Sequence, residues 1–307
     1  MSKHTKKLIR RRKTKTRHIK TPKFCAPFVS PNKTISNGKV KSCLDRKALL
    51  RLVHAWNSRN TVNKIPIHGN NTTLWSALND RMKTRCAPGQ EFCWMQQPEI
   101  KSVSTSIDVY KPPMPKEWYD NPDEWLNTLD IQAIMQQYER AYHQFRFIGP
   151  VPMDFDKKMG FGHCVVDELC NINVRKLHSS GIRQIGVIFN LDSHDKPGSH
   201  WVAMFCCMNQ CGIYYWDSYG MEPTNEVTKL MTRMKEHCDI MGKNMDIKIN
   251  NIRHQYKNSE CGVYSLHFII QLLKGRSFES IVNNIIRDEE MLEYRNALYN
   301  KLNPKTK

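Results

Sequence analysis

The residue types best suited to chemistry in this chain include a cysteine at the start of an apolar stretch. Cys261 follows the polar segment 254–260 and precedes an apolar run that continues to Leu273. A run that is hydrophobic on nearly every side predicts a helix buried in a core. With Ser259 as the predicted N-cap, Cys261 falls in the first turn of that helix. Free backbone N–H groups and the helix dipole favour a thiolate there, so Cys261 is the candidate nucleophile.

A base and an orienting acid for this thiolate are predicted by a hairpin. Segments 200–206 and 212–217 have the composition of strands and are joined by only a few residues, which predicts an antiparallel pair. Paired residue numbers in a hairpin have a constant sum, and a turn near Met208–Asn209 sets it near 417, the sum for His200 and Asp217. A carboxylate beside an imidazole orients the ring and supports the imidazolium. A slip of the register by a residue or two would change this pairing.

An oxyanion donor is available in the loop before the cysteine. Gln255 lies six residues before Cys261, and its neutral amide can join the backbone N–H of Cys261 in an oxyanion hole. Thiolate attack on an amide bond, followed by hydrolysis of an acyl-enzyme, is the reaction that such a set supports. His194 is a rival base, but its loop, residues 192–198, indicates a solvated side chain.

The elements that must carry these groups mix helices and strands without strict alternation, which favours an α+β fold. The hydrophobic periodicity predicts strands at 145–155, 184–190, 200–206, 212–217 and 246–251, and helices at 42–56, 73–82, 123–140, 164–177, 224–241, 260–274 and 288–299. A proline-rich break at 111–115 separates a small helical module, residues 42–110, from a catalytic domain, residues 111–307.

Positive charge is concentrated at the N-terminus. Lys and Arg exceed Asp and Glu by 18 in the whole chain, and residues 1–41 contain 14 basic and no acidic side chains. This composition predicts a disordered basic tail that can bind the phosphate backbone of a nucleic acid. A solubilising or nuclear-import role explains the same composition equally well.

The remaining composition limits the class of protein. No run of 18 apolar residues is present, and the basic N-terminus lacks the apolar segment of a secretion signal, so neither a membrane span nor secretion is expected. Eleven cysteines in such a chain predict free thiols in a reducing compartment. The pairs Cys86 and Cys93, and Cys164 and Cys170, lack the spacing of a zinc site. We therefore expect neither a metal nor a cofactor.

Most other prominent cysteines, histidines and tryptophans have a structural interpretation. Packing is predicted for Cys206, Cys207, His267, Trp94, Trp118 and Trp125, and Cys211 is predicted to be an inert thiol in a turn. For His254, a structural role and a contact with substrate are both open. Trp201 differs from the other tryptophans because it follows His200 directly.

Several of these residues together resemble a known clan. His200–Trp201, Trp216–Asp217–Ser218, Gln255 and Cys261–Gly262, in this order, are similar to the ubiquitin-like-protein proteases and the adenovirus protease. The segments 147–155, 186–192 and 196–201 further resemble thiol proteases of large cytoplasmic DNA viruses. The resemblance covers residues 117–275 well and 42–100 more loosely.

This resemblance implies a papain-like cysteine protease fold, with a central mixed sheet and the nucleophile on a buried helix, plus an N-terminal helical module. It implies that Cys261 is the nucleophile, His200 the general base, Asp217 its orienting group and Gln255 part of the oxyanion hole. Trp201 is then expected to line a narrow channel for a substrate that ends in Gly–Gly.

Viral members of the clan mature virion polyproteins, and cellular members release ubiquitin-like modifiers. The expected function is therefore a cysteine endopeptidase that processes viral structural polyproteins in the virion and the host cytoplasm. The alternatives are a deconjugating protease for SUMO-type modifiers and a basic nucleic-acid-binding virion protein. The expected partners are a protein substrate and, through residues 1–41, a nucleic acid, with no membrane.

Overall fold

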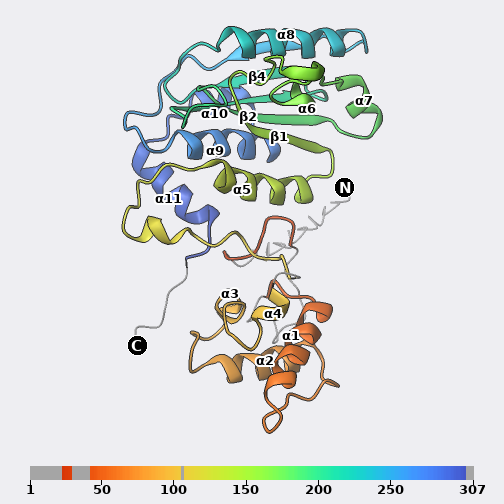
Figure 1. The fold of residues 1–307 in the computed structure, drawn as a ribbon, viewed down its shortest axis with the longest axis vertical. Coiled ribbons are helices and arrows are strands. Elements are labelled where there is room, and N and C mark those ends of the chain that lie inside the picture. The colour runs from red at the N-terminus through yellow and green to blue at the C-terminus, as the bar shows by residue number, and fades with distance from the viewer. Residues whose placement is uncertain (1–22, 30–41, 105–106, 302–307) are drawn as a thin grey trace, which may run out of the picture.

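The computed structural model describes residues 23–29, 42–104 and 107–301. It consists of a small helical module and a larger body in which helices cover both faces of one sheet (Figure 1). The expected α+β fold with a central mixed sheet is confirmed. Among the described residues, no helix combines the length and the apolar character needed to cross a membrane.

The sheet of the larger body has five strands in the order β1-β2-β3-β4-β5. Their bounds are Phe145–Pro152 (β1), Gln184–Asn190 (β2), Trp201–Cys207 (β3), Gly212–Trp216 (β4) and Asp246–Ile249 (β5). The outer pairs, β1 with β2 and β4 with β5, are parallel, and the two inner pairs are antiparallel. Strand β3 is buried along its whole length, because helices cover both of its faces.

Each face of the sheet packs against its own set of helices (Figure 1). One face is covered by α5 (Thr128–Ala141), α9 (Cys261–Leu273), α10 (Phe278–Val282) and α11 (Asp288–Leu298), and the other by α6 (Asp167–Cys170), α7 (Val174–Ser179) and α8 (Asn225–Asp239). Alternate residues of β3 face opposite ways: Ala203 joins the first core and Met204 the second. Every residue of α9 except Gln271 is buried, as the apolar run predicts.

Two of the predicted helices differ in the structure. The helix predicted from residue 123 begins at Thr128, because Asn127 and Asp130 form a capping box. It is preceded by a short 3-10 helix, η1 (Lys116–Tyr119). The helix predicted at 164–177 is replaced by α6 and α7, and the side chain of Asn173 caps the second of these. Local capping residues, which the periodicity does not register, account for both differences.

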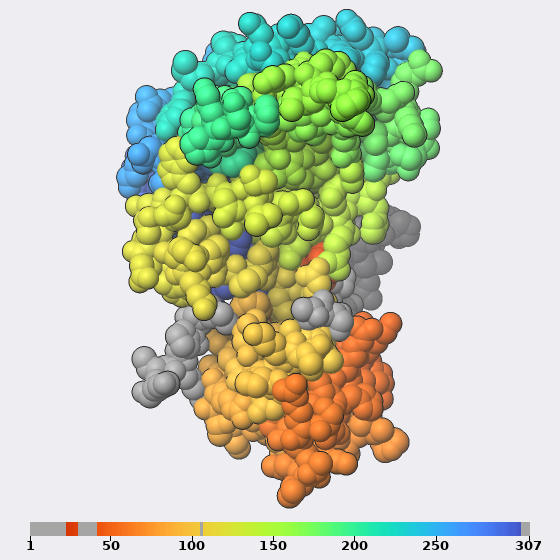
Figure 2. Space-filling view, in the orientation of Figure 1, coloured from red at the N-terminus to blue at the C-terminus, as the bar shows by residue number. Residues whose placement is uncertain are grey.

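The N-terminal module consists of α1 (Arg46–Arg59), α2 (Asn71–Met82), α3 (Glu91–Trp94) and α4 (Lys101–Ser104). These helices enclose a separate hydrophobic core that includes Leu49, Leu78 and Trp94. Figure 2 shows the module as a lobe beside the larger body. The short helices α3 and α4 were not expected, since four residues are too few for a periodic pattern to be visible.

Residues 23–29 differ from the expectation of a disordered tail. Cys25 and Ala26 are buried, and the Ala26 N–H donates to the Val109 carbonyl over 2.9 Å. Cys25 also forms a disulfide with Cys43. This segment therefore packs on the module, while residues 1–22 and 30–41 of the predicted tail lie outside the described residues.

The expectation of free thiols is wrong for six of the eleven cysteines. Besides Cys25–Cys43, the structure contains the disulfides Cys86–Cys93 and Cys164–Cys170. The free cysteines are Cys206, Cys207, Cys211, Cys238 and Cys261. A gap of six or seven residues in the sequence had excluded zinc for the last two pairs, but it does not exclude an S–S bond, which depends on distance in the fold.

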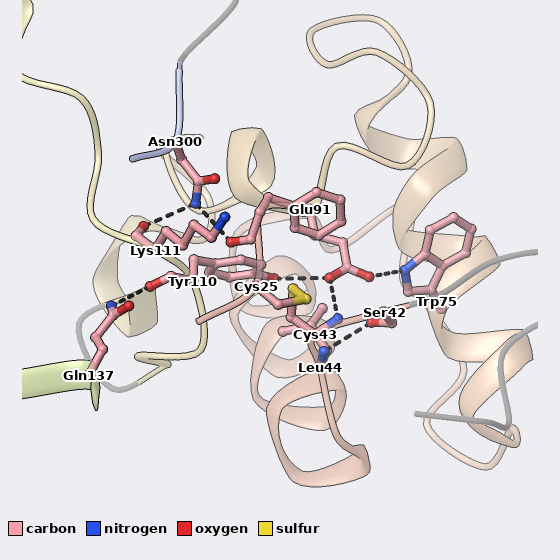
Figure 3. Close-up of a disulfide and its surroundings, with 11 residues drawn as sticks. Cys25, Ser42, Cys43, Leu44, Trp75, Glu91, Tyr110, Lys111, Gln137 and Asn300 are labelled. Carbon is pink, nitrogen blue, oxygen red and sulfur yellow. Dashed lines mark hydrogen bonds between the residues drawn. A yellow bond between two sulfur atoms is a disulfide. The ribbon is translucent and has the colours of Figure 1, made fainter. Parts of the chain in front are cut away.

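A buried carboxylate organises the module beside the Cys25–Cys43 disulfide (Figure 3). Glu91 is fully buried and accepts hydrogen bonds from the Cys43 N–H at 3.0 Å, the Trp75 Nε1–H at 2.6 Å and the Tyr110 hydroxyl at 3.3 Å. Burial raises the pKa of Glu91, and these donors oppose the shift. The carboxylate therefore holds together three segments of the chain that are distant in sequence.

Replacing Glu91 with glutamine is expected to destabilise the module. In Glu91→Gln the amide nitrogen must face at least one donor, which leaves that buried donor unpaired and lowers the free energy of unfolding by about 1–3 kcal/mol. Chemical denaturation followed by tryptophan fluorescence measures this, because Trp75 and Trp94 both lie in this core.

Glu99→Gln is the matched control in the same module. Glu99 pairs with Arg85, whose side chain is 47% exposed, and such a pair contributes less than about 1 kcal/mol. If the two variants unfold at the same denaturant concentration, Glu91 does not have the role described here.

Candidate active site

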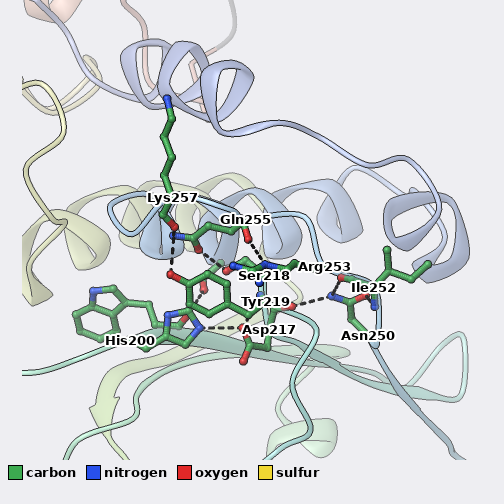
Figure 4. Close-up of polar contacts among 11 residues, drawn as sticks. His200, Asp217, Ser218, Tyr219, Asn250, Ile252, Arg253, Gln255 and Lys257 are labelled. Carbon is green, nitrogen blue, oxygen red and sulfur yellow. Dashed lines mark hydrogen bonds and ion pairs between the residues drawn. The ribbon is translucent and has the colours of Figure 1, made fainter.

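His200 and Asp217 meet at one edge of the sheet. His200 directly precedes β3 and Asp217 directly follows β4, and His200 Nε2 lies 2.8 Å from Asp217 Oδ1 (Figure 4). The two side chains are only 11% and 2% exposed. Because a carboxylate accepts, Nε2 carries the proton of this hydrogen bond, and Nδ1 is left to exchange a proton with another group.

The register of the hairpin differs from the predicted one. Ala203 pairs with Trp216 and Phe205 with Tyr214. The residue numbers of each pair therefore add up to 419, and the predicted sum of 417 is wrong by two. The strands are joined by residues 208–211, and Cys211 has a left-handed φ of 49°, which moves the centre of the turn by one residue. A shift of two keeps every side chain on its face of the sheet. His200 and Asp217 therefore still meet, although not as directly opposed residues.

Cys261 is the first residue of α9 and is almost fully buried. Its N-cap is Glu260 and not Ser259 as predicted, and no side chain caps the helix. The Cys261 thiol lies close enough to His200 for its hydrogen bonding and charge to raise the pKa of the histidine. The structure thus brings Cys261 to the histidine that is already bonded to Asp217.

The environment of His200 favours its charged form. Burial is the largest single influence and lowers the pKa, but the hydrogen bonds and charges of Asp217 and Cys261 together outweigh it and raise the pKa of His200 to about 9. At neutral pH the ring is therefore an imidazolium. A cationic imidazole beside a cysteine at a helix N-terminus is an arrangement that supports a thiolate.

The amide of Gln255 is oriented by the groups around it (Figure 4). Gln255 is fully buried, its Nε2 donates to the Lys257 carbonyl at 2.8 Å, and its Oε1 accepts from the Ser218 hydroxyl at 2.6 Å. A backbone carbonyl can only accept, so the nitrogen end of the amide must face Lys257. One of the two Nε2 hydrogens remains for another acceptor.

Trp201 lies against the start of α9. Its Nε1–H donates to the Leu126 carbonyl over 2.9 Å. A side chain at Gly262 would come within 3.1 Å of Leu126 Cβ and 3.2 Å of Trp201 Cδ1, so only glycine fits there without displacement. Trp125, for which packing was predicted, is 39% exposed next to Leu126.

The other three histidines considered from the sequence, His194, His254 and His267, have partners or surroundings of their own. His194, the rival base, pairs with Asp154 at 2.7 Å and lines a cavity of about 330 Å³ together with Trp201. His254 is buried with Nε2 3.0 Å from the Val282 carbonyl, which indicates a structural role. Burial lowers the pKa of His267 to about 4, as suits a neutral core histidine.

A buried ion pair beside the cysteine was not predicted. Glu260 and Arg295, a residue of α11, are both nearly inaccessible to solvent and lie 3.1 Å apart. Arg295 also donates to the carbonyls of Pro122 and Glu124, and its guanidinium carbon lies 3.9 Å from the centroid of the Trp118 ring. Burial raises the pKa of Glu260 to about 7, against the opposing effect of Arg295.

The start of α11 holds the other end of the same loop. Asp288 accepts from the backbone N–H groups of Tyr256 at 3.0 Å and Lys257 at 3.1 Å. The polar loop that leads to Cys261 is therefore attached to α11 at both ends. Neither contact was visible in the sequence, because about thirty residues separate the partners.

Comparison with known proteins agrees with this geometry. The model of the Ulp1 protease family, C-terminal catalytic domain, matches residues 182–304. The putative thiol protease R355 of Acanthamoeba polyphaga mimivirus is 42% identical over 177 residues, which are 57% of this chain and 57% of the relative. A cysteine protease of African swine fever virus (isolate Tick/Malawi/Lil 20-1/1983) is 36% identical over 227 residues, 68% of this chain and 82% of the relative. This chain belongs to the Ulp1 protease family.

The expected family of cysteine proteases is thereby confirmed, with viral thiol proteases among its relatives. A crystal structure of the African swine fever virus protease superimposes with a TM-score of 0.65 at 23% identity, covering 92% of this chain and 98% of that one. The two proteins therefore share a fold over nearly their whole lengths, including the N-terminal module.

Loss of the buried arginine is expected to destabilise this family member. Arg295→Met leaves the Glu260 carboxylate buried without its partner, which lowers the free energy of unfolding by about 3 kcal/mol. Adding Glu260→Gln removes the unpaired charge, so the double variant is expected to recover part of that loss in chemical denaturation. A double variant no more stable than Arg295→Met would show that the ion pair is not what Arg295 contributes.

Proposed function

We propose that this chain is a cysteine endopeptidase with Cys261 as nucleophile, His200 as general base, Asp217 as the group that orients it and Gln255 as an oxyanion donor. The observation that carries the proposal is that His200 is hydrogen-bonded to Asp217 and has its pKa raised by Cys261, which begins a buried helix. The pKa of His200, raised to about 9, supports a thiolate–imidazolium pair at neutral pH.

In the first half of the reaction, the thiolate of Cys261 attacks the carbonyl carbon of the scissile peptide. The carbonyl oxygen becomes an oxyanion, which accepts the free Nε2–H of Gln255 and the backbone N–H of Cys261. The imidazolium of His200 then gives its Nδ1 proton to the departing amine, the C–N bond breaks, and a thioester remains on Cys261.

In the second half, a water molecule hydrolyses the thioester. Neutral His200 takes a proton from the water, and the oxygen attacks the thioester carbonyl. The C–S bond breaks, the carboxylate product leaves, and the thiolate–imidazolium pair is restored. The Nε2–H···Oδ1 bond to Asp217 keeps the ring in one orientation throughout.

The surroundings of Cys261 support a substrate with small residues at the cleavage site. A side chain at Gly262 would meet Leu126 Cβ at 3.1 Å and Trp201 Cδ1 at 3.2 Å, so the chain is closely packed directly after the nucleophile. A Gly–Gly sequence has no side chains to accommodate. The exposed indole of Trp125 next to Leu126 is a further surface against which an extended peptide can lie.

The proposed substrate is a viral structural polyprotein, processed in the virion or in the host cytoplasm, as the viral origin of the relatives supports. A second candidate is removal of a ubiquitin-like modifier, because a 27%-identical relative from African swine fever virus is named a "SUMO-1 cysteine protease". Binding of nucleic acid through residues 1–41 is proposed from composition alone.

Replacement of the nucleophile tests the proposal. A thiol-reactive probe ending in Gly–Gly is expected to label wild type and Cys211→Ala equally and to leave Cys261→Ala unlabelled, read by intact-protein mass spectrometry. Cys211 is a suitable control because it is a free cysteine that is partly exposed, whereas Cys261 is buried. Equal labelling of all three proteins, or of none, contradicts the assignment of Cys261.

Two forms of the probe separate the candidate substrates. A short peptide ending in Gly–Gly and a complete ubiquitin-like protein with the same reactive end are compared at equal concentration. Similar labelling rates favour cleavage of polyproteins, since the peptide alone carries the recognition. Labelling by the complete modifier that is faster by an order of magnitude or more favours deconjugation.

The pH dependence of kcat/KM tests the role of Asp217. A pKa of about 9 for His200 means that the imidazolium persists until the pH rises through that value, so activity is expected to fall above about pH 9. In Asp217→Asn the support for the imidazolium is lost, so the fall is expected at a lower pH and the maximum should drop by about 100-fold or more. Asp154→Asn, which alters the separate His194–Asp154 pair, should leave the pH of the fall unchanged.

A further inference from the structure

We propose that Tyr219 is a positioning residue for the reaction, in which its ring supports the imidazolium of His200 and its hydroxyl orients the oxyanion donor through the Lys257 carbonyl. The inference rests on the proposed function, because it assigns Tyr219 a role toward His200, Asp217 and Gln255. It depends on contacts that reach all three of these residues from one side chain and its backbone.

The ring of Tyr219 lies flat against the imidazole of His200. The two ring centroids are 4.7 Å apart and the planes are inclined by only 19° (Figure 4). The face of an aromatic ring carries partial negative charge and attracts a cation placed over it. The stacking therefore favours the imidazolium over the neutral ring and limits rotation of the histidine.

The backbone of Tyr219 reaches the orienting acid. Its N–H donates to Asp217 Oδ1 over 2.8 Å, and the same oxygen accepts from His200 Nε2. His200 and Tyr219 both lie just beyond the same end of the hairpin. His200 directly precedes the strand whose residue Ala203 pairs with Trp216, and Tyr219 lies in the turn that follows Trp216 and Asp217.

The hydroxyl of Tyr219 reaches the loop that carries Gln255. It donates to the Lys257 carbonyl over 3.1 Å, and that carbonyl also accepts from Gln255 Nε2 at 2.8 Å. The carbonyl is thus fixed by two donors, and its position determines the direction of the remaining Nε2–H of Gln255. A shift of this carbonyl would misdirect the oxyanion donor without changing any catalytic residue.

The side chains that surround His200 come from three segments of the chain. Asp217 follows β4, Cys261 begins α9, and Tyr219 lies in the loop after Asp217. The guanidinium carbon of Arg253 lies 5.1 Å from the centroid of the Tyr219 ring and 4.8 Å from that of Tyr256. Tyr256 therefore shares the cation of Arg253 with Tyr219.

Two substitutions separate the ring from the hydroxyl. Tyr219→Leu removes both, and Tyr219→Phe removes only the hydroxyl. With Tyr219→Leu, the basic limb of kcat/KM and the titration of His200 followed by NMR are expected at a pH lower by about half a unit to one unit. With Tyr219→Phe, both should stay in place, while kcat falls about fivefold at unchanged KM.

Tyr256→Leu is the matched control. Tyr256 is 70% exposed and lies against Arg253, but no contact joins its ring to His200, Asp217 or Gln255 among the described residues. The control is expected to retain the wild-type titration of His200. Thermal melting of each variant establishes that the chain is folded under the assay conditions.

The outcomes distinguish a failure of the role of Tyr219 from a failure of the proposed protease function. A wild type that does not react with the Gly–Gly probe overturns both. A reactive wild type whose His200 titrates at the same pH in Tyr219→Leu overturns the role of the ring, and an unchanged kcat in Tyr219→Phe overturns the role of the hydroxyl. A shift in Tyr256→Leu equal to that in Tyr219→Leu would also overturn the role of the ring, because it would trace the effect to Arg253.

Discussion

The hydrogen bond between His200 and Asp217 is the interaction on which the rest of the site depends. It holds a cationic ring at the edge of a sheet whose central strand is buried on both faces, where an unpaired charge would be costly. Asp217 in turn is fixed by its own main chain, because its carbonyl accepts from Asn250 Nδ2 at 2.7 Å and from the Gly220 N–H at 2.9 Å. The cation next to Cys261 is thus stabilised by a carboxylate that cannot move away.

The faces of the elements could be predicted from the sequence, and their exact pairing could not. Alternation along 201–207 assigns Ala203 and Met204 to opposite cores whatever the register. The register itself depended on residues 208–211, where Cys211 adopts a left-handed conformation that is uncommon for a cysteine. Because the sum of paired residue numbers changed by two, each side chain stayed on its predicted face. His200 and Asp217 therefore lie at the same edge of the sheet although the predicted pairing was wrong.

The parts of the site that were missed are contacts between distant segments. Glu260 falls at the start of the predicted helix 260–274 and Arg295 within the predicted helix 288–299, and nothing in the sequence indicated that the two are buried and paired. Nothing in the periodicity of 288–299 distinguishes an arginine that faces solvent from one that faces a buried carboxylate. The same limit applies to Cys25 and Cys43, because a disulfide forms only between cysteines that the fold brings close together. Tyr219 was missed because its contacts with His200 and Lys257 join segments that are distant in sequence.

Helix α9 and the polar loop before it position different groups of the site. Helix α9 fixes Cys261 by burial on every side but offers no side chain as a cap. Gln255, the proposed oxyanion donor, must instead be directed by the loop, whose carbonyls and amides are free of helical bonding. Asp288 fixes the Tyr256 and Lys257 amides, Arg295 fixes Glu260, and the Lys257 carbonyl fixes Gln255. Helix α11 is therefore as much a part of this site as the strands that carry the histidine and the aspartate.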